Sequence, residues 1–581
     1  MTLAEVWAPD AEVVELVHQP LDGGETVRTV LDRDDDGWHR GGDLAPGDRY
    51  RFSLDDGEPL PDPRSGWQPD GIDGPSAVDD PSSFGWTDAA WRGFHLPGSV
   101  LYELHVGTFS PEGTFDGAVA HLDHLVELGV DAVEVMPVAE FMGERGWGYD
   151  GVLLRAPHHA YGGPDGFRRF VDACHARGLG VLLDVVYNHL GPKGNHLARF
   201  GPYFTDHHHT PWGQAVNLDG PGAVEVRRFV IEGVTRWLRD FHVDGLRLDA
   251  CHALVDDSAV HLLEELAVEV AALAAHVGRP LWLIAESDRH DPRTIRPVEA
   301  GGLGLHAQWA DDLHHALHAA LVGERDGYYA DFGSVATIAE ALTEVYVDAG
   351  RYSPMRGRVH GRPVTGIGGD RFVVCTQNHD QIGNRARGER LAHLVDEGAA
   401  RVAAALVLTS PCTPLLFQGE EWAASTPFPY VVDVPDDPEL ATAIRDGRRN
   451  EFAAFGWAPE DVPDPLDPAT FASATLRWKE LARGEHARML DWYRSLLALR
   501  RARPDLTDPR RDEAHLSVTF HEAGRWLVMR RAATTVAVNF AEGGRTVPVG
   551  DRTEILLASA GDVSVTAGEV ALPPLSVAVL A

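Results

Sequence analysis

Hydrophobic residues follow one pattern at each end of the chain and a different pattern between them. In residues 1–96, alternating stretches such as Glu12–Val17 and Arg49–Leu54 are separated by turn signals at Asp22–Gly24 and Asp36–Gly37. A period of two is typical of half-buried strands. These residues predict a small N-terminal β-sandwich. A generic packing domain is the alternative.

In residues 97–505 the pattern changes to apolar stretches that alternate with helical ones. The predicted strands lie near 100–104, 132–136, 180–186, 245–248, 281–285, 305–309, 372–376 and 415–418. The clearest predicted helices are 117–128, 166–177, 224–241, 260–277 and 401–409, by apolar spacing. Eight strands alternating with helices predict an α/β fold, a (β/α)8 TIM barrel. A loop-like insertion, 189–221, follows the third strand.

A doubly wound open sheet is the competing architecture for this region. It would require a glycine-rich phosphate loop after the first strand, and Leu104–Thr108 is not one. After the barrel, alternation returns in Arg525–Arg530 and Thr535–Phe540. Residues 506–581 therefore predict a C-terminal antiparallel β-sandwich.

Charge and cysteine content narrow the class of protein. The formal net charge of −37 argues against nucleic acid or an anionic membrane as a partner. Four cysteines in 581 residues are not a disulfide framework, so we expect buried, reduced thiols. The first residues lack a basic segment followed by an apolar core, and no apolar run reaches membrane-spanning length. We expect a cytoplasmic protein, and the sequence makes no prediction of its oligomeric state.

The fourth predicted strand ends in V-D-G-L-R-L-D-A-C-H, residues 243–252, and presents polar groups beside an apolar stretch. Arg247 and Asp249 are two residues apart, so on a strand their side chains point to the same face. An arginine beside a carboxylate favours its ionised form. Such an aspartate suits a glycosyl-accepting nucleophile. A structural ion pair at the end of the strand is the plain alternative.

Three carboxylates follow three separate predicted strands, where the chemistry of a barrel gathers. They are Asp249 after the fourth, Glu286 after the fifth and Asp380 after the seventh. Cleavage of a glycosidic bond needs a nucleophile, an acid and stabilisation of an oxocarbenium-like state. Glu286 follows the apolar stretch 281–285, which favours a protonated acid, and Asp380 suits transition-state binding. A salt bridge at the rim would explain one carboxylate better than it explains three.

These strand ends resemble the signature regions of the α-amylase family of glycoside hydrolases. The segments concerned are 184–189, 247–252, 284–288 and 377–381. The resemblance implies a (β/α)8 barrel, a retaining mechanism and the three carboxylate roles given above. It further implies sugar contacts by the side chains of Asp184, Asn188, His189, Arg247, His379 and Gln381.

A narrower resemblance covers most of the chain. The segments Y-E-L-H-V-G-T-F-S-P-E-G-T-F, R-G-W-G-Y-D-G-V, G-P-Y-F-T, A-Q-W-A-D-D-L-H-H-A-L-H and Q-N-H-D-Q-I-G-N-R are similar to the maltooligosyltrehalose trehalohydrolase subfamily. This subfamily hydrolyses the α-1,4 bond next to the terminal trehalose. The resemblance places His252, Asp311 and Asp312 in the substrate groove. It also implies Trp212, Tyr328 and Arg356 on the leaving-trehalose side.

Two alternatives to this function stay open. A branching or debranching enzyme would share the barrel and the carboxylates, because loops decide between these activities. A non-catalytic α-glucan-binding protein would have no need of all three carboxylates. No cofactor or metal is expected, because the histidine run 207–209 has no carboxylate pattern at ligand spacing beyond Asp206.

Overall fold

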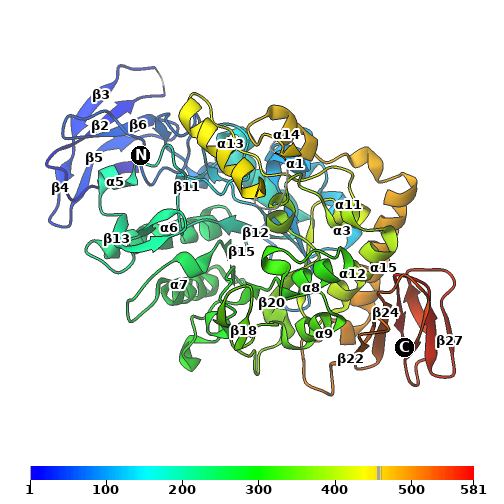
Figure 1. The fold of residues 1–581 in the computed structure, drawn as a ribbon. Coiled ribbons are helices and arrows are strands. Elements are labelled where there is room, and N and C mark those ends of the chain that lie inside the picture. The colour runs from blue at the N-terminus through cyan, green and yellow to red at the C-terminus, as the bar shows by residue number, and fades with distance from the viewer. Residues whose placement is uncertain (1, 22, 454–457, 459–460) are drawn as a thin grey trace.

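The computed structural model describes residues 2–21, 23–453, 458 and 461–581, and its centre is a closed parallel barrel (Figure 1). The order β12-β15-β16-β17-β20-β21-β8-β9 closes the sheet, which confirms the TIM barrel and excludes an open doubly wound sheet. The strands are β8 (Leu101–Leu104), β9 (Ala132–Val135), β12 (Gly180–Val185), β15 (Gly245–Leu248), β16 (Trp282–Ala285), β17 (Ala307–Trp309), β20 (Phe372–Cys375) and β21 (Thr413–Phe417).

The barrel strands are short and almost wholly buried, so their sequences are apolar runs rather than alternating ones. Gly245 opens β15 at a close approach between strands. A Cβ there would lie 2.4 Å from the carbonyl oxygen of Trp282 and 2.8 Å from the Leu182 side chain. Glycine is therefore required for β15 to pair with β16.

Helices surround the barrel, most of them where apolar spacing predicts them. They include α4 (Gly163–Ala176), α6 (Ala223–Asp240), α7 (Leu262–Val277), α12 (Glu397–Thr409) and α15 (Gly484–Ala502). The prediction of one helix over 117–128 is wrong, because α2 (Phe115–Val119) and α3 (Leu122–Leu128) are separate. Between them His121 has non-helical backbone angles, and its ring stacks on Trp478 at 3.8 Å. A tertiary contact thus accompanies the break.

Antiparallel sheets lie at opposite ends of the molecule, with the barrel between them (Figure 1). The N-terminal sheets have the orders β1-β5-β4 and β3-β2-β6-β7, and the C-terminal sheets have β22-β23-β24-β29-β26 and β25-β28-β27. The N-terminal strands are β1 (Thr2–Trp7), β2 (Val14–Gln19), β3 (Val27–Val30), β4 (Asp32–Arg33), β5 (Trp38–Leu44), β6 (Arg49–Leu54) and β7 (Ser76–Ala77). The C-terminal strands are β22 (Ser517–His521), β23 (Trp526–Arg531), β24 (Thr534–Asn539), β25 (Arg545–Pro548), β26 (Ile555–Ala558), β27 (Ser564–Thr566), β28 (Glu569–Leu572) and β29 (Ser576–Leu580). The boundaries at residues 96 and 505 stay predictions.

The insertion after β12 is more regular than the expected loop. It contains α5 (Leu197–Phe200) and an antiparallel hairpin of β13 (Phe204–Thr210) and β14 (Gly213–Val216). The polar histidines of β13 are partly exposed, which is why the segment lacks the apolar alternation that predicts strands.

A buried carboxylate joins the segment after β7 to two barrel helices. Asp79 accepts hydrogen bonds from both terminal nitrogens of Arg168 on α4, at 2.9 and 2.6 Å. Arg236 on α6 donates to the same carboxylate at 2.6 Å. All four cysteines are buried and unpaired. No helix among the described residues has the length and apolar character needed to cross a membrane.

Candidate active site

The three predicted catalytic carboxylates line one cavity of about 760 Å³ at the C-terminal ends of the strands. Asp249 follows β15, Glu286 follows β16, and Asp380 lies in the short helix α10 (His379–Gly383) after β20. Asn378 caps this helix and accepts a hydrogen bond from the backbone N–H of Asp380 at 2.9 Å. Separate strands therefore bring the three groups together, as the sequence predicts.

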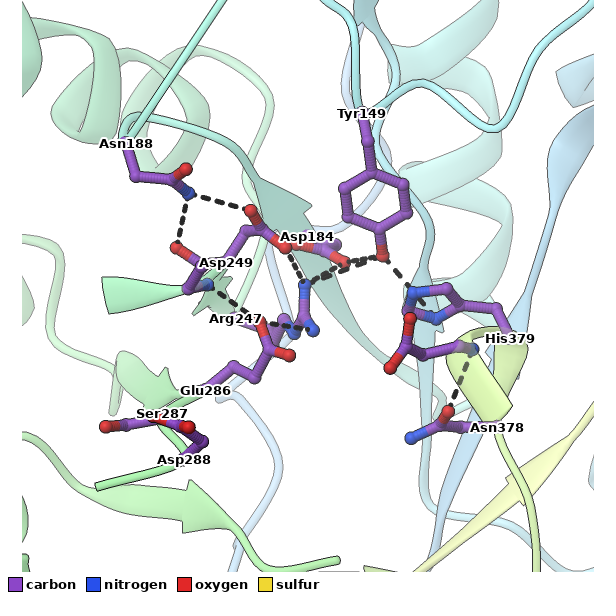
Figure 2. A network of polar contacts seen from close by, with 12 residues as sticks. Tyr149, Asp184, Asn188, Arg247, Asp249, Glu286, Ser287, Asp288, Asn378 and His379 are labelled. Carbon is purple, nitrogen blue, oxygen red and sulfur yellow. Dashed lines mark hydrogen bonds and ion pairs between the residues drawn. The ribbon is translucent and has the colours of Figure 1, made fainter. Parts of the chain in front are cut away.

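Arg247 is the shared partner of two of these carboxylates (Figure 2). Its Nη1 lies 3.0 Å from Asp249 Oδ1, and its Nη2 lies 3.0 Å from Glu286 Oε2. Nη1 also lies 2.6 Å from Asp184 Oδ2. The arginine side chain is 1% exposed, so these contacts act in a poorly hydrated place where charges interact strongly. The predicted Arg247–Asp249 pair is present, and Glu286 shares the same guanidinium.

The surroundings of Glu286 favour a protonated carboxyl. Burial raises the pKa of Glu286 to about 8; Arg247 opposes this rise, and Asp249 and Asp380 add to it. Ala250 also opposes this rise, because it donates its backbone N–H to Glu286 Oε2 at 2.7 Å. Ala250 has a φ of 35°, in the left-handed region that a residue with a Cβ rarely adopts. At neutral pH Glu286 can therefore donate a proton.

Asp184 and Asn188, which follow the third barrel strand, hold the central groups in place. Asn188 Nδ2 donates to Asp249 Oδ2 at 2.7 Å and to the Asp249 carbonyl oxygen at 2.8 Å. Asp184 accepts from Arg247 and, at 2.5 Å, from the hydroxyl of Tyr149. Asp184 and Asn188 are almost fully buried, so they orient the residues that line the cavity.

Aromatic and basic side chains form part of the wall of this cavity. His189 and Trp212 both line the cavity, and their rings stack at 4.5 Å with an angle of 7°. His252 also lines it and lies 3.7 Å from Asp288. Arg356 lies 2.9 Å from that same Asp288, although it does not line the cavity itself.

Seven of the predicted substrate-binding residues do not line this cavity, namely Asp184, Asn188, Asp311, Asp312, Tyr328, Arg356 and Gln381. Asp312 is 1% exposed, accepts from the backbone N–H of Val347 at 2.6 Å and lies 3.2 Å from His290. The buried Asp312 carboxylate binds Val347 and His290 within the protein. The expectation that Asp312 lines the substrate groove is therefore wrong. Asp311 accepts from Gln381 Nε2 at 3.2 Å.

Gln381 itself serves the backbone of α10. Its Oε1 accepts from the N–H of Asn378 at 3.0 Å, which completes a capping box. Tyr328 lines a neighbouring cavity of about 470 Å³ instead. That cavity shares Asn384 and Glu451 with the catalytic one, and Asn384 donates to Asp380 at 2.7 Å. Tyr328 therefore lines a cavity that adjoins the catalytic one near Asp380, and its contact with the leaving trehalose stays a prediction.

Several residues of the cavity wall are absent from the predicted set. Trp147, Tyr149 and Asp150 belong to the quoted segment R-G-W-G-Y-D-G-V, so the signal was present in the sequence. Burial raises the pKa of Asp150 to about 6. Arg448 and Glu451 come from α13 (Pro438–Ala453), which carries no motif that marks a site.

Two groups of described side chains place potential metal-binding atoms within 4.8 Å of one another. They are Glu140, His158 and His159, and His208, Asp219 and Asp257. The expectation that the histidine run has no carboxylate beyond Asp206 is therefore wrong for His208. The fold brings Asp219 to 2.8 Å from it and Asp257 to 4.0 Å, from loops distant in sequence. The His208–Asp219 contact is a direct hydrogen bond. Asp206, the carboxylate nearest in sequence, accepts a hydrogen bond from Gln214.

An eight-stranded parallel barrel whose strand ends hold three carboxylates around one arginine defines the class of α-amylase-type glycoside hydrolases. Residues 69–202 match the family described as "Alpha amylase, catalytic domain". Residues 511–579 match "Domain of unknown function (DUF3459)". A solved structure named as a putative alpha amylase from Salmonella typhimurium is 38% identical, with a TM-score of 0.90 and coverage of 100% of this chain and 97% of that chain.

Two relatives specify the family further. The malto-oligosyltrehalose trehalohydrolase of Rhizobium sp. (strain M-11) is 48% identical over 99% of this chain and 97% of its own. That of Mycobacterium tuberculosis (strain CDC 1551 / Oshkosh) is 51% identical over 94% of this chain and 93% of its own. The chain belongs to the malto-oligosyltrehalose trehalohydrolase family.

Proposed function

We propose that the protein hydrolyses the α-1,4 bond next to the terminal trehalose of maltooligosyltrehalose and releases trehalose. The observation that supports cleavage of a glycosidic bond most strongly is the arrangement of Asp249 and Glu286 at the two ends of one guanidinium, where burial raises the pKa of Glu286 to about 8. One carboxylate is thereby available for attack while the other is available to protonate the leaving oxygen. The relatives named as trehalohydrolases support trehalose as the product.

The reaction proceeds with retention in two steps. Asp249 attacks the anomeric carbon while Glu286 gives its proton to the glycosidic oxygen, so trehalose leaves and a glycosyl–Asp249 ester forms. Glu286, now a carboxylate, removes a proton from water, which attacks the same carbon and frees Asp249. Asp380 also lines the cavity and stabilises the positive charge that develops on the sugar. A separation of about 5–5.5 Å between the Asp249 and Glu286 carboxyls is the matching prediction.

The leaving trehalose lies on the Glu286 side, because that group protonates its oxygen. Trp212 and His252 line the cavity and would offer the leaving trehalose an aromatic face and a polar edge. Arg356 supports the same side through Asp288. His189 and His379 line the cavity and contact the sugar whose bond is cleaved.

Product analysis tests the proposal against its alternatives. Purified protein is incubated with maltooligosyltrehalose, plain maltooligosaccharide of equal length and glycogen. Trehalose release from the first, far faster than any cleavage of the second, supports the assignment. New α-1,6 bonds would indicate a branching enzyme, and loss of α-1,6 bonds a debranching one. Tight binding of the glucan without any product would indicate a binding protein.

Two isosteric variants test the roles of the carboxylates. Asp249→Asn and Glu286→Gln each lower kcat by several orders of magnitude while the thermal unfolding transition persists. Glu286→Gln keeps more of its first step on a glycosyl fluoride, whose leaving group needs less protonation, and Asp249→Asn does not. If Glu286→Gln lost the same factor on the glycosyl fluoride as on maltooligosyltrehalose, Glu286 would not be the acid that protonates the leaving group.

We also infer a cytoplasmic, nucleic-acid-free protein with an α-glucan oligosaccharide as its partner. The four unpaired cysteines support a reducing compartment, and the charge of −37 disfavours a phosphate-backbone ligand.

A further inference from the structure

Glu103, on the first barrel strand β8, contacts His379 through both of its carboxylate oxygens. Oε2 accepts the backbone N–H of His379 at 3.0 Å, and Oε1 lies 2.5 Å from the ring nitrogen Nδ1. Glu103 is 1% exposed, so water does not compete for these contacts. The Glu103 side chain therefore holds the backbone of His379 in place and orients its ring so that Nδ1 faces Glu103.

The remaining surroundings leave the other ring nitrogen for the cavity. The ring of Tyr149 stacks on His379 at 4.9 Å and 23°, and Trp147 meets it edge-on at 5.6 Å. Among the residues that the structure describes, Nε2 of His379 has no hydrogen-bond partner, and His379 lines the catalytic cavity. Figure 2 shows His379 beside Tyr149, across the site from Asp249. A sugar hydroxyl in the cavity would supply the missing acceptor.

We propose that Glu103 is a positioning residue for this reaction, which holds His379 as an imidazolium whose Nε2–H donates to a hydroxyl of the sugar at the cleaved bond. The proposal rests on the proposed glycosidase function. A hydrogen bond from a charged donor is about twice as strong as a neutral one, and in a buried site it keeps its geometry. Glu103 acts through His379 and does not itself touch the substrate.

A second buried glutamate, Glu134, lies beside Glu103 on the neighbouring strand. Glu134 on β9 pairs in register with Glu103, is 1% exposed, and neither of its carboxyl oxygens has a hydrogen-bond partner among the described residues. Burial, and then Glu103, raise the pKa of Glu134 well above its usual range. Two adjacent buried carboxyls do not both ionise, so Glu134 keeps its proton and Glu103 accepts from His379.

The balance of charge around His379 favours its protonated ring. Burial lowers the pKa of His379, but the contact with Glu103 outweighs burial and the net direction is upward. The other charged or titratable groups that face the ring are Arg247, Asp184, Asp380, His105 and Tyr149. Arg247 opposes the protonated ring and Asp380 supports it, so Glu103 is the contact whose loss changes the balance most.

The variant Glu103→Gln tests this role. Its amide can accept from only one of the two His379 N–H groups and presents a donor to the other. We expect kcat on maltooligosyltrehalose to fall roughly 10–100-fold, in the range seen for residues that orient a functional group, with a much smaller change in KM. Because the pKa of His379 falls without Glu103, the alkaline limb of the activity profile moves to lower pH. Compared with Glu103→Gln, the variant Glu103→Asp should have a higher kcat, and its alkaline limb of activity should lie at the same pH as in the wild type.

Glu134→Gln is the matched control. It is isosteric, equally buried and on the neighbouring strand, yet it replaces a neutral acid by a neutral amide, so we expect kcat and the pH profile to stay unchanged. A loss in Glu103→Gln that is the same factor at every pH would overturn the proposal, because a purely structural defect gives that result.

Selective ¹⁵N-histidine labelling reads the ring without any substrate. The His379 signals are assigned as those missing from His379→Asn. We expect both ring nitrogens of wild-type His379 to show imidazolium shifts at pH 7, and neutral shifts in Glu103→Gln. A neutral ring in the wild type would overturn the proposal whether or not Glu103→Gln folds. Absence of trehalose release with an imidazolium signal would refute the proposed function instead.

Discussion

Glu286 and Asp312 show at the scale of single residues how neighbouring acids acquire different tasks. The Glu286 side chain is 25% exposed and lies beside two other carboxyls; its neutral form is favoured, and it borders the cavity. Asp312 is buried, but His290 and the Val347 N–H stabilise its charge, and the pKa of Asp312 is lowered despite the cost of burial. Burial alone therefore does not create an acid catalyst, since the partners decide its protonation.

The raised pKa of Glu286 predicts the alkaline limit of activity. The acid is protonated below a pKa of about 8 and loses its proton above it, so the rate is present at lower pH and falls as pH rises. We expect kcat/KM for maltooligosyltrehalose to decline tenfold per pH unit beyond that value. Initial rates between pH 5 and 10 check this. A profile that declines already from pH 5 would show that Glu286 is ionised in the free enzyme.

Asp311 and Asp312 are adjacent in sequence but should respond differently to alanine. Asp312→Ala leaves a buried N–H and a buried histidine without their partner, which costs roughly 1–3 kcal/mol of stability for each such group. We expect a lower Tm and an unchanged ratio of kcat/KM between maltooligosyltrehalose and maltooligosaccharide. Asp311→Ala, which loses one contact to Gln381, should change the Tm less. A changed substrate ratio in Asp312→Ala alone would restore its assignment to the groove.

At the scale of elements, the sequence predicted those helices and strands that the local spacing of apolar residues determines. All eight barrel strands were identifiable because each is a short, largely apolar run between helical or loop segments. The break at His121 was not, because its contact with Trp478 joins residues far apart in sequence. The hairpin β13–β14 escaped prediction because its residues are polar. Arg448 and Glu451 reach the cavity from α13, and only the folded chain shows that this helix borders it.

The group formed by His208 on β13, Asp219 and Asp257 is a candidate metal site that can be tested. Asp219 Oδ2 accepts from His208 Nε2 at 2.8 Å and from the N–H of Asp257 at 2.9 Å, so protein donors already occupy this oxygen. We expect activity and Tm to persist after exhaustive dialysis against EDTA. Recovery of lost activity by one divalent metal, and its absence in Asp219→Asn, would instead identify a metal site here.

At the scale of the whole molecule, buried ion pairs join the N-terminal sheets to the barrel. Asp79, whose side chain is 8% exposed, receives Arg168 and Arg236 from two barrel helices. A bidentate arginine contact fixes geometry as well as charge. The strands before residue 78 and helices α4 and α6 should therefore unfold together rather than as independent units.

Asp79→Ala tests this connection. It removes the carboxylate that two buried guanidinium groups share, so Arg168 keeps the exposed Asp165 and Arg236 keeps Asp240 as carboxylate partners. Breaking a buried pair costs about 3–5 kcal/mol. We expect a single unfolding transition at lower temperature in calorimetry, with kcat unchanged at temperatures where the variant is folded. Asp165→Ala is the control, because Asp165 also contacts Arg168 but is 66% exposed, so its loss should be nearly neutral. Two separate transitions in the wild type would contradict the coupling.

The guanidinium of Arg247 has a consequence for attempts to engineer the enzyme. Because it contacts Asp184, Asp249 and Glu286 at once, a substitution intended to retune the acid also disturbs the nucleophile. Effects of paired substitutions around it should be far from additive, and beneficial changes should have to be found jointly. Single substitutions around Arg247 should therefore seldom improve activity. Libraries that vary several of its neighbours together should yield improved variants more often.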